Sequence, residues 1–533
     1  MPDPGSPGAR PATSLRPSSD ATALSRTILA ATLVAALLRL FRLGHQSLWI
    51  DEQFTLLAAG VPGPFDPHAL LDNVHGPLHA AVVAAFAAVG GLSEVVLRLP
   101  SALAGIALVP VMAWLATRFT GRETAAPAAW LTAGAPFAIW YSQECRNYAF
   151  LLLASALATG ALLGLHERIR ARGVAGYALA AAAGLLSNFS FVFLAPLHLK
   201  WWLEPGPTEA GRRRTVVVVV AIAALAALPW LPAIRGIWDW SRLAPGRSVE
   251  AGETALRGQH TFHLAAVPFA LHAFVMGYSG GPSLRELRSR PEQAVRRHAP
   301  ELALAALVFG FLGFRGIGAL VRRRRLTDAL LGLVAPALAV SYFAANNFKV
   351  FHPRYLAAAW PLVLLGMAAA FADLGPRTRR VLAVAVTLLW AVAYARVSFE
   401  PAYGREDYRT AMTRVRSGLT PGERVIAVGA PEPVEWYGRG LPLRRFWLGY
   451  TSDDVRFARA WRDSVGEVPP GLWVVTSRTE DLDPTGSFAR RLNRVTTVAD
   501  RDTFAGVSVW HLRERSPAAR PATGVTPAEG VAH

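Results

Sequence analysis

Eleven apolar stretches of membrane-spanning length constrain the fold of this chain more than any other feature of its sequence. About 20 predominantly apolar residues are needed to cross a bilayer as a helix. The stretches that we predict to span lie near 23–41, 98–118, 124–141, 148–165, 174–187, 188–203, 215–235, 300–320, 327–346, 354–373 and 380–398. The sequence therefore predicts a mainly α, polytopic membrane protein.

The charge composition agrees with a membrane protein. Charged residues make up 17% of the 533 residues, whereas a soluble protein carries about 25%. The net charge of +18 comes almost entirely from arginine, since only Lys200 and Lys349 are lysines. A basic chain can bind nucleic acid, but in an apolar chain basic loops set the orientation in the bilayer. We therefore expect membrane lipid, and no nucleic acid, among its partners.

Arginine clusters fix the expected orientation, because basic residues favour cytoplasmic loops. Alternate connections carry the clusters Arg118 with Arg122, Arg168/Arg170/Arg172, Arg212–Arg214, Arg322–Arg325 and Arg377/Arg379/Arg380. Two further apolar stretches, 77–92 and 263–280, would reverse this order if they crossed the bilayer. We therefore expect both to be juxtamembrane or re-entrant helices on the external side.

The rest of the chain divides into tails and one small domain. Residues 1–22 and 516–533 are rich in Pro, Gly, Ser, Ala or Thr and are predicted to be disordered, the first in the cytoplasm. Residues 23–400 form the transmembrane domain. Residues 401–515 combine amphipathic helices near 406–417 and 453–465 with short β-branched runs at 425–428 and 473–476, which predicts an α/β domain. An odd number of spans places that domain outside the cytoplasm.

Asp51 and Glu52 follow the first predicted span within a few residues. Carboxylates at the edge of the hydrocarbon indicate function, water exposure or a charged partner. One interpretation is a solvated loop. The other is a general base at the membrane interface, where partial desolvation raises the pKa of a carboxylate and makes it a better proton acceptor.

A second polar segment, WYSQECRNYAF at 140–150, is also external by the same topology. Glu144 and Tyr148 share one face of a helix, and Arg146 points elsewhere. The three residues fit a substrate site, a structural ion pair or an aromatic interface belt. Cys145 lies among them without the histidine and Asn or Asp that a cysteine nucleophile needs. As the only cysteine, it also excludes an intramolecular disulfide framework.

A third segment, NNFKVFHPRYLAAAWP at 346–361, carries Lys349, His352 and Arg354 on the external side. Cations there run against the orientation rule. Together with Arg98 and Arg146 they could bind an anionic headgroup or a leaving phosphate. The alternative is that their long side chains reach lipid phosphate without a role in chemistry.

Histidines offer a weaker signal. His75 precedes the 77–92 stretch and could bind a substrate or a metal, or be merely hydrogen-bonded. His260, His263 and His272 lie in or beside the 263–280 stretch without any known ligand motif. We therefore assign no metal ligand, and the involvement of a divalent metal stays open.

Several motifs together resemble glycosyltransferase family 39, the GT-C-fold membrane enzymes that include protein mannosyltransferases and aminoarabinose transferases. They are the Asp-Glu pair at 51–52, HGPL at 75–78, SEVVLRLPSALAG at 93–105, YSQECRNYA at 141–149 and PRYLAAAWP at 353–361. Their order and spacing match the family over roughly residues 23–400.

The resemblance implies transfer of a sugar, hexosyl or pentosyl, from a polyprenyl-phosphate carrier to an external glycan, lipid or protein acceptor, with inversion. It implies that Asp51 is the base and that Glu52 supports it. Glu144 and Arg146 would line the site, and Lys349 and Arg354 would face the carrier phosphate. The abundance of Ala and Arg is typical of a GC-rich bacterial gene, so we expect the bacterial inner (plasma) membrane.

Two other functions compete with this interpretation. A lipid-linked oligosaccharide transporter or flippase would carry ionisable residues at mid-membrane depth in several spans, whereas this sequence keeps them mainly at the ends of its spans. A non-catalytic scaffold would leave the external acidic pair and the external cations without a role.

Overall fold

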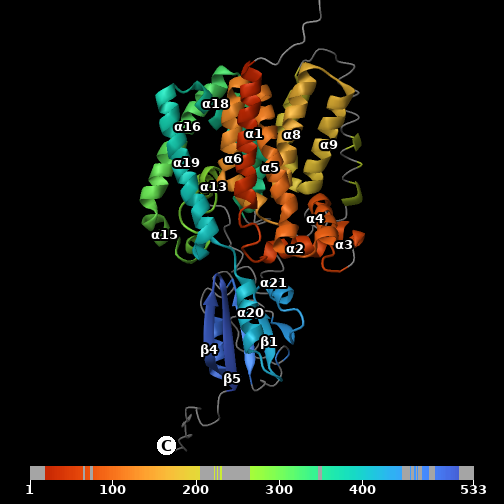
Figure 1. Cartoon of the computed structure of the whole chain (residues 1–533), viewed down its shortest axis with the longest axis vertical. Coiled ribbons are helices and arrows are strands. Elements are labelled where there is room, and N and C mark those ends of the chain that lie inside the picture. Colours follow the sequence, from red (N-terminus) through yellow and green to blue (C-terminus); the bar gives the residue numbers. More distant parts are fainter. Residues whose placement is uncertain are drawn as a thin grey trace, which may run out of the picture.

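The computed structural model describes residues 19–63, 66–71, 76–204, 264–345, 351–446, 471–478 and 487–514, with isolated residues in 221–230 and 457–465. A bundle of long helices forms the upper part of the molecule in Figure 1. The C-terminal α/β domain lies below the bundle, next to the short helices that connect the first long ones.

Six helices among the described residues are long and apolar enough to cross a membrane. They are α1 (Ser19–Leu40), α5 (Glu94–Phe119), α8 (Tyr148–Glu167), α16 (Ala299–Arg322), α18 (Trp360–Asp373) with its preceding 3-10 turn Pro353–Ala359, and α19 (Pro376–Phe399). Shorter apolar helices α9 (Ala171–Ser187), α10 (Ala195–Leu203) and α17 (Leu326–Ala345) fall on predicted spans. The polytopic fold is confirmed, and the total of eleven spans stays a prediction.

The predicted span 124–141 is broken into α6 (Ala125–Gly134) and α7 (Pro136–Ser142). Ala135 is extended, as a residue before proline prefers. The break leaves carbonyls of α6 without helical partners, and Arg39 of α1 supplies donors. Its buried guanidinium donates to the carbonyl oxygens of Thr132 (3.0 Å) and Ala133 (2.9 Å).

Short helices gather at the lower end of the bundle (Figure 1). They include α2 (Ile50–Ala58), α3 (Pro67–Leu71), α4 (Pro77–Gly90) and α15 (Pro291–Arg297). Two further short helices, α13 (Ala266–Met276) and α14 (Leu284–Ser289), precede α15 in the chain. Both α4, with 14 residues, and α13, with 11, are too short to span a bilayer as straight helices. Their lengths support the prediction that 77–92 and 263–280 do not cross the membrane.

The C-terminal domain contains a five-stranded mixed sheet in the order β2-β1-β3-β5-β4. Its described elements are α20 (Tyr408–Gly418), β1 (Arg424–Val428), α21 (Pro431–Tyr437), β2 (Leu443–Phe446), β3 (Leu472–Ser477), α24 (Ser487–Val495), β4 (Thr496–Phe504) and β5 (Val507–Glu514). The strands β1, β2 and β3 are parallel, whereas β5 runs antiparallel to β3. The strands predicted at 425–428 and 473–476 are thereby confirmed, and the helix predicted near 453–465 lies largely outside the described residues.

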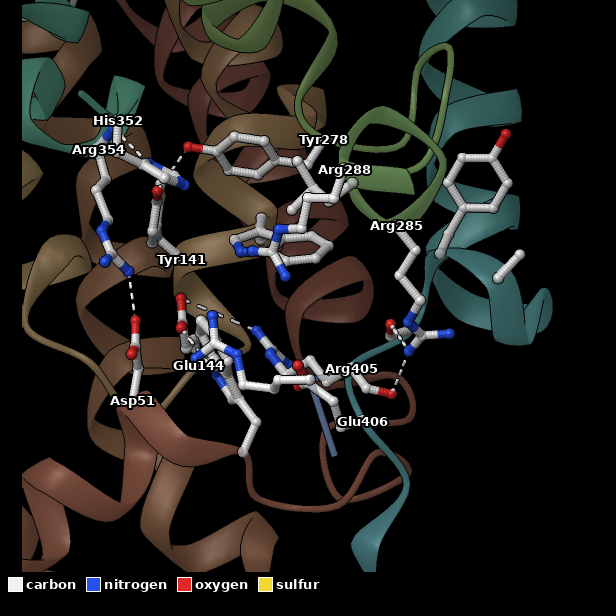
Figure 2. A pocket seen from close by; sticks show the side chains of 17 residues that line it. Asp51, Tyr141, Glu144, Tyr278, Arg285, Arg288, His352, Arg354, Arg405 and Glu406 are labelled. Carbon is white, nitrogen blue, oxygen red and sulfur yellow. Dashed lines mark hydrogen bonds and ion pairs between the residues drawn. The ribbon is translucent and has the colours of Figure 1, made fainter. Parts of the chain in front are cut away.

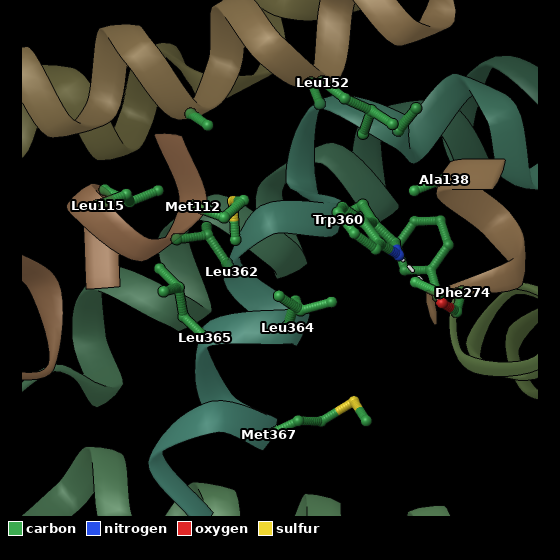
Figure 3. Close-up of a cluster of buried hydrophobic side chains, with 14 of the residues drawn as sticks. Met112, Leu115, Ala138, Leu152, Phe274, Trp360, Leu362, Leu364, Leu365 and Met367 are labelled. Carbon is green, nitrogen blue, oxygen red and sulfur yellow. Dashed lines mark hydrogen bonds between the residues drawn. The ribbon is translucent and has the colours of Figure 1, made fainter. Parts of the chain in front are cut away.

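One large hydrophobic core holds the bundle together, and α18 runs through it. Figure 3 shows Trp360 of α18 beside Phe274 of α13, with Leu362, Leu364 and Met367 further along the helix. The indole N–H of Trp360 donates to the carbonyl oxygen of Phe274 at 3.0 Å. Because Trp360 follows Arg354 by six residues along a continuous 3-10 and α-helical segment, this packing also fixes the position of Arg354.

Candidate active site

A cavity of about 120 Å³ lies where the bundle meets the C-terminal domain. Figure 2 shows polar side chains converging on it from several elements. It is lined by Trp49, Asp51, Trp140, Tyr141, Glu144, Tyr278, Leu284, Arg285, Arg288, His352, Arg354, Ala402, Tyr403, Gly404, Arg405, Glu406 and Arg478. Five arginines face three carboxylates here, so the cavity suits an anionic group.

Asp51 lies in the first turn of α2 and reaches the cavity. Its carboxylate forms an ion pair with Arg354, which begins the segment before α18 (Figure 2). Burial raises the pKa of Asp51, but the charges of Arg354 and Arg146 and the hydrogen bond from Arg354 outweigh it and hold the pKa well below its usual range. The expectation that desolvation raises this pKa is therefore wrong, and Asp51 is ionised at neutral pH.

Glu52, next to Asp51 in α2, faces away from the cavity. Its fully buried carboxylate accepts hydrogen bonds from Arg98 at 2.7 and 2.8 Å and from the Cys145 N–H at 2.7 Å. Burial raises the pKa of Glu52, but the Arg98 charge and hydrogen bonds outweigh burial and lower it. Glu52 thus connects α2 to α5 and to the loop after α7.

Arg98 does not belong to the cavity, contrary to the expectation that it binds an anion. Besides Glu52, its guanidinium donates to the carbonyl oxygens of Leu43, Gln46 and Ser47 at 2.8 to 3.0 Å. These bonds occupy its donors with partners inside the protein. The sequence reveals its charge but cannot reveal that the partner is Glu52.

Glu144 reaches the cavity from the loop after α7. One carboxylate oxygen accepts the Trp49 indole N–H at 3.1 Å, and the other has no hydrogen-bond partner among the described residues. Arg405 lies 4.0 Å from that second oxygen. Burial raises the pKa of Glu144 to about 7, an effect that Arg405 opposes and that Glu52 and Asp51 reinforce. Glu144 is therefore partly protonated at neutral pH, whereas Asp51 is ionised.

Arg146 and Tyr148 do not line the cavity. They contact two residues that do, Asp51 and Arg354. Arg146 donates to the backbone oxygen of Asp51 at 2.8 Å and to the Thr55 hydroxyl at 3.1 Å. The ring of Tyr148 lies under the Arg354 guanidinium at 5.9 Å. Cys145 beside them is buried, and burial raises the pKa of its thiol well above the usual range, so it is not an activated nucleophile.

His352 and Arg354 both line the cavity, two residues apart. His352 Nδ1 accepts the backbone N–H of Arg354 at 3.2 Å. Burial, aided by the Arg354 charge, lowers the pKa of His352 well below its usual range, so its imidazole is neutral. His75 and Lys349, which we also predicted to bind substrate, lie outside the described residues.

Four cavity arginines were not predicted from the sequence: Arg285, Arg288, Arg405 and Arg478. Arg285 of α14 donates to the carbonyl oxygens of Gly404 (2.8 Å) and Arg405 (3.0 Å), which fixes the segment between α19 and α20. Arg285 and Arg288 lie in an external connection by the predicted topology. They therefore carry the same signal as Lys349 and Arg354, namely basic residues on the side of the membrane where such residues are disfavoured. Arg405 and Arg478 reach the cavity only through tertiary folding.

No group of three or more His, Cys, Asp or Glu residues within the described ranges is arranged to hold a metal ion. His272, within α13, makes no such cluster there, and His260 and His263 lie outside these ranges.

Glu144 makes stability depend on pH. A carboxyl group whose pKa rises on folding binds its proton more tightly in the folded state, so its contribution to stability falls as pH rises from 4.5 to 7. We expect the wild type to lose up to about 3 kcal/mol relative to Glu144→Gln across this window. Thermal unfolding of both proteins at pH 5 and pH 8 measures the difference. Glu292→Gln, at a side chain 87% exposed, should parallel the wild type, and a Glu144→Gln protein that also parallels it would contradict the expectation.

Comparison with known proteins gives the family and the fold that the chain resembles. Residues 74–232 match the family model described as Dolichyl-phosphate-mannose-protein mannosyltransferase. No curated protein sequence gives a significant match.

Solved structures extend the likeness to nearly the whole chain. ArnT from Cupriavidus metallidurans bound to undecaprenyl phosphate is 15% identical, with 95% of this chain and 100% of that chain covered at a TM-score of 0.54. The apo state of the same protein gives 15% identity, 92% and 98% coverage and a TM-score of 0.56. The Archaeoglobus fulgidus oligosaccharyltransferase in its apo form is 15% identical, with 86% of this chain and 70% of that chain covered at a TM-score of 0.51. The chain therefore has the GT-C membrane fold, and the resemblance to the mannosyltransferase family that its motifs predicted is confirmed.

Proposed function

We propose that the protein is an integral-membrane glycosyltransferase that moves a sugar from a polyprenyl-phosphate donor to an acceptor hydroxyl on the extracytoplasmic face, with inversion. The observation that carries the proposal is the pair of Asp51 and Arg354 in a cavity with excess positive charge. A base and a set of cations are what the reaction needs, because phosphate is already a good leaving group.

In the proposed reaction, the donor phosphate engages Arg354 and frees Asp51 from its ion pair. The ionised Asp51 then takes the proton of the acceptor hydroxyl while the hydroxyl oxygen attacks the anomeric carbon. The bond between that carbon and the phosphate oxygen breaks, and its electron pair leaves with the polyprenyl phosphate. Arg354 stabilises the charge that develops on the phosphate.

The other predicted site residues take supporting roles in this proposal. Glu52 is a positioning residue, since it acts on Asp51 through the ion pair with Arg98 and the backbone of Cys145. Glu144 and His352 bind the sugar or the acceptor from the cavity wall.

Arg146 and Tyr148 hold Asp51 and Arg354 in place from behind. His75 and Lys349 remain proposed substrate-binding residues on the strength of the motif resemblance alone.

The donor class is supported by the neighbours, one of which was solved with undecaprenyl phosphate bound. The acceptor is an external glycan, lipid or protein. We place the enzyme in a bacterial inner membrane, in line with its abundance of Ala and Arg. Its cavity and C-terminal domain would lie outside the cytoplasm, as the arginine distribution predicts.

Membranes that contain the protein, incubated with a panel of radiolabelled polyprenyl-phosphate sugars, test the proposal. We expect one labelled donor to be consumed, with release of free polyprenyl phosphate and appearance of the label in a new product. A transporter or flippase would instead move an intact labelled lipid between leaflets of a sealed vesicle. Movement of intact lipid without cleavage of any donor would overturn the proposal.

A further inference from the structure

Arg478 belongs to the C-terminal domain and yet lines the cavity of the transmembrane bundle. It follows β3, the strand shared between the parallel and antiparallel parts of the sheet. In open α/β sheets, ligands bind beyond the carboxyl ends of the parallel strands. Here that edge of the sheet faces the cavity of the bundle.

The backbone at Arg478 is unusual. Its φ is +55°, in the left-handed region that residues other than glycine rarely adopt. Such conformations persist where the surrounding structure imposes them, and they gather at functional sites. Beside it, the Ser477 hydroxyl accepts the Ala430 N–H at 3.2 Å, which ties the end of β3 to the segment that follows β1.

Hydrogen bonds and an ion pair fix the C-terminal domain, which carries Arg478, to the segment just before Asp51 and to the start of α5. The Tyr437 hydroxyl of α21 donates to the Glu94 carboxylate at 2.8 Å and accepts the Leu48 N–H at 2.7 Å. Arg409 of α20 forms an ion pair with the same carboxylate at 2.6 Å. Leu48 precedes Asp51 by three residues, so these bonds couple the position of the domain to the position of the proposed base.

The charges around Asp51 come from both parts of the molecule. Arg354 of the bundle and Arg478 of the C-terminal domain both line the cavity, and both act electrostatically on the Asp51 carboxylate. Arg146, the third cation that acts on it, lies behind the cavity. An anion that enters beside Asp51 therefore meets at least one cavity-lining cation from each part.

We propose that Arg478 binds the phosphate of the polyprenyl carrier together with Arg354, so that the C-terminal domain supplies part of the phosphate site. The inference rests on the proposed function and goes beyond it, because it assigns substrate binding to a domain that otherwise only covers the cavity. Two guanidinium groups match the charge of a phosphate and its several acceptor oxygens.

Binding of undecaprenyl phosphate to the purified full-length protein in lipid nanodiscs tests the inference. We expect Arg478→Gly to raise the Kd by about 10-fold, the loss typical of a charged hydrogen bond. Glycine is the preferred replacement, because it accepts the positive φ and therefore removes the cation without adding backbone strain. Arg478→Lys should restore part of the affinity, since lysine keeps the charge but not the planar fork.

Arg513→Ala is the matched control. Arg513 is exposed on β5. Its neighbour Leu512 pairs with Leu472 at the start of β3, whereas Arg478 follows the other end of that strand. We expect it to bind as the wild type does. Equal Kd values for Arg478→Gly, Arg513→Ala and the wild type would overturn this inference and leave the proposed function intact. A wild type that binds no undecaprenyl phosphate would overturn both.

Discussion

Asp51→Asn is expected to abolish sugar transfer. Asparagine keeps the shape of the side chain but cannot take a proton from the acceptor hydroxyl, and a positioned general base contributes about 10² to 10⁴ in rate. The low pKa of Asp51 means that the wild-type base is ionised across the physiological range. Single-turnover release of polyprenyl phosphate, measured on membranes with equal amounts of inserted protein, gives the size of the loss.

Asp66→Asn is the control for this variant. Asp66 lies in the same connection between α1 and α5, is exposed, and accepts the His68 N–H at 2.8 Å, a bond that an asparagine oxygen preserves. It should transfer sugar at the wild-type rate. If Asp51→Asn also does so, the base is another group.

Breaking the buried pair of Glu52 and Arg98 is expected to have the largest effect on stability. Removing one partner leaves an uncompensated buried charge, which typically costs about 3–5 kcal/mol. Glu52→Gln and Arg98→Met should therefore each lower the midpoint of thermal unfolding in detergent. Because Glu52 also accepts the Cys145 N–H, the loss should loosen the segment that carries Glu144.

The double variant Glu52→Leu with Arg98→Met separates stability from activity. Two apolar side chains remove both charges, so part of the lost stability should return. The carbonyl oxygens of Leu43, Gln46 and Ser47 still lose the hydrogen bonds from Arg98. Transfer should stay low, because the bonds that fix the start of α2 are still missing. Full recovery of transfer would show that the pair has no positioning role, and single variants as stable as the wild type would contradict its energetic one.

The long apolar helices were predictable because length and composition suffice to identify them. The stretches 98–118, 148–165 and 300–320 became α5, α8 and α16 with ends shifted by a few residues. The break at Ala135 was not predicted, since the apolar composition continues across it. Pro136 was a visible signal, but a proline within a predicted span can also kink a helix without ending it.

For the site, the sequence identified carboxylates and cations at the right ends of the helices but not their partners. Asp51, Glu144 and Arg354 do meet at one cavity. Arg98 was misassigned because only the folded chain reveals that it is enclosed with Glu52. Arg478 is separated from Asp51 by more than 400 residues in sequence, and no local pattern encodes such a contact.

Arg39 carries a consequence for how this bundle can vary in evolution. Two residues far apart in sequence determine the break between α6 and α7. Pro136 begins α7, and Arg39 on α1 donates to the carbonyl oxygens that the break leaves without helical partners. A chain that lost Pro136 and closed the helix would take from the buried Arg39 its acceptors at Thr132 and Ala133, leaving only Ser142 and Ala35. A chain that lost Arg39 would leave the carbonyl oxygens at the break without a donor. The two positions are therefore expected to change together in related sequences, although 97 residues separate them.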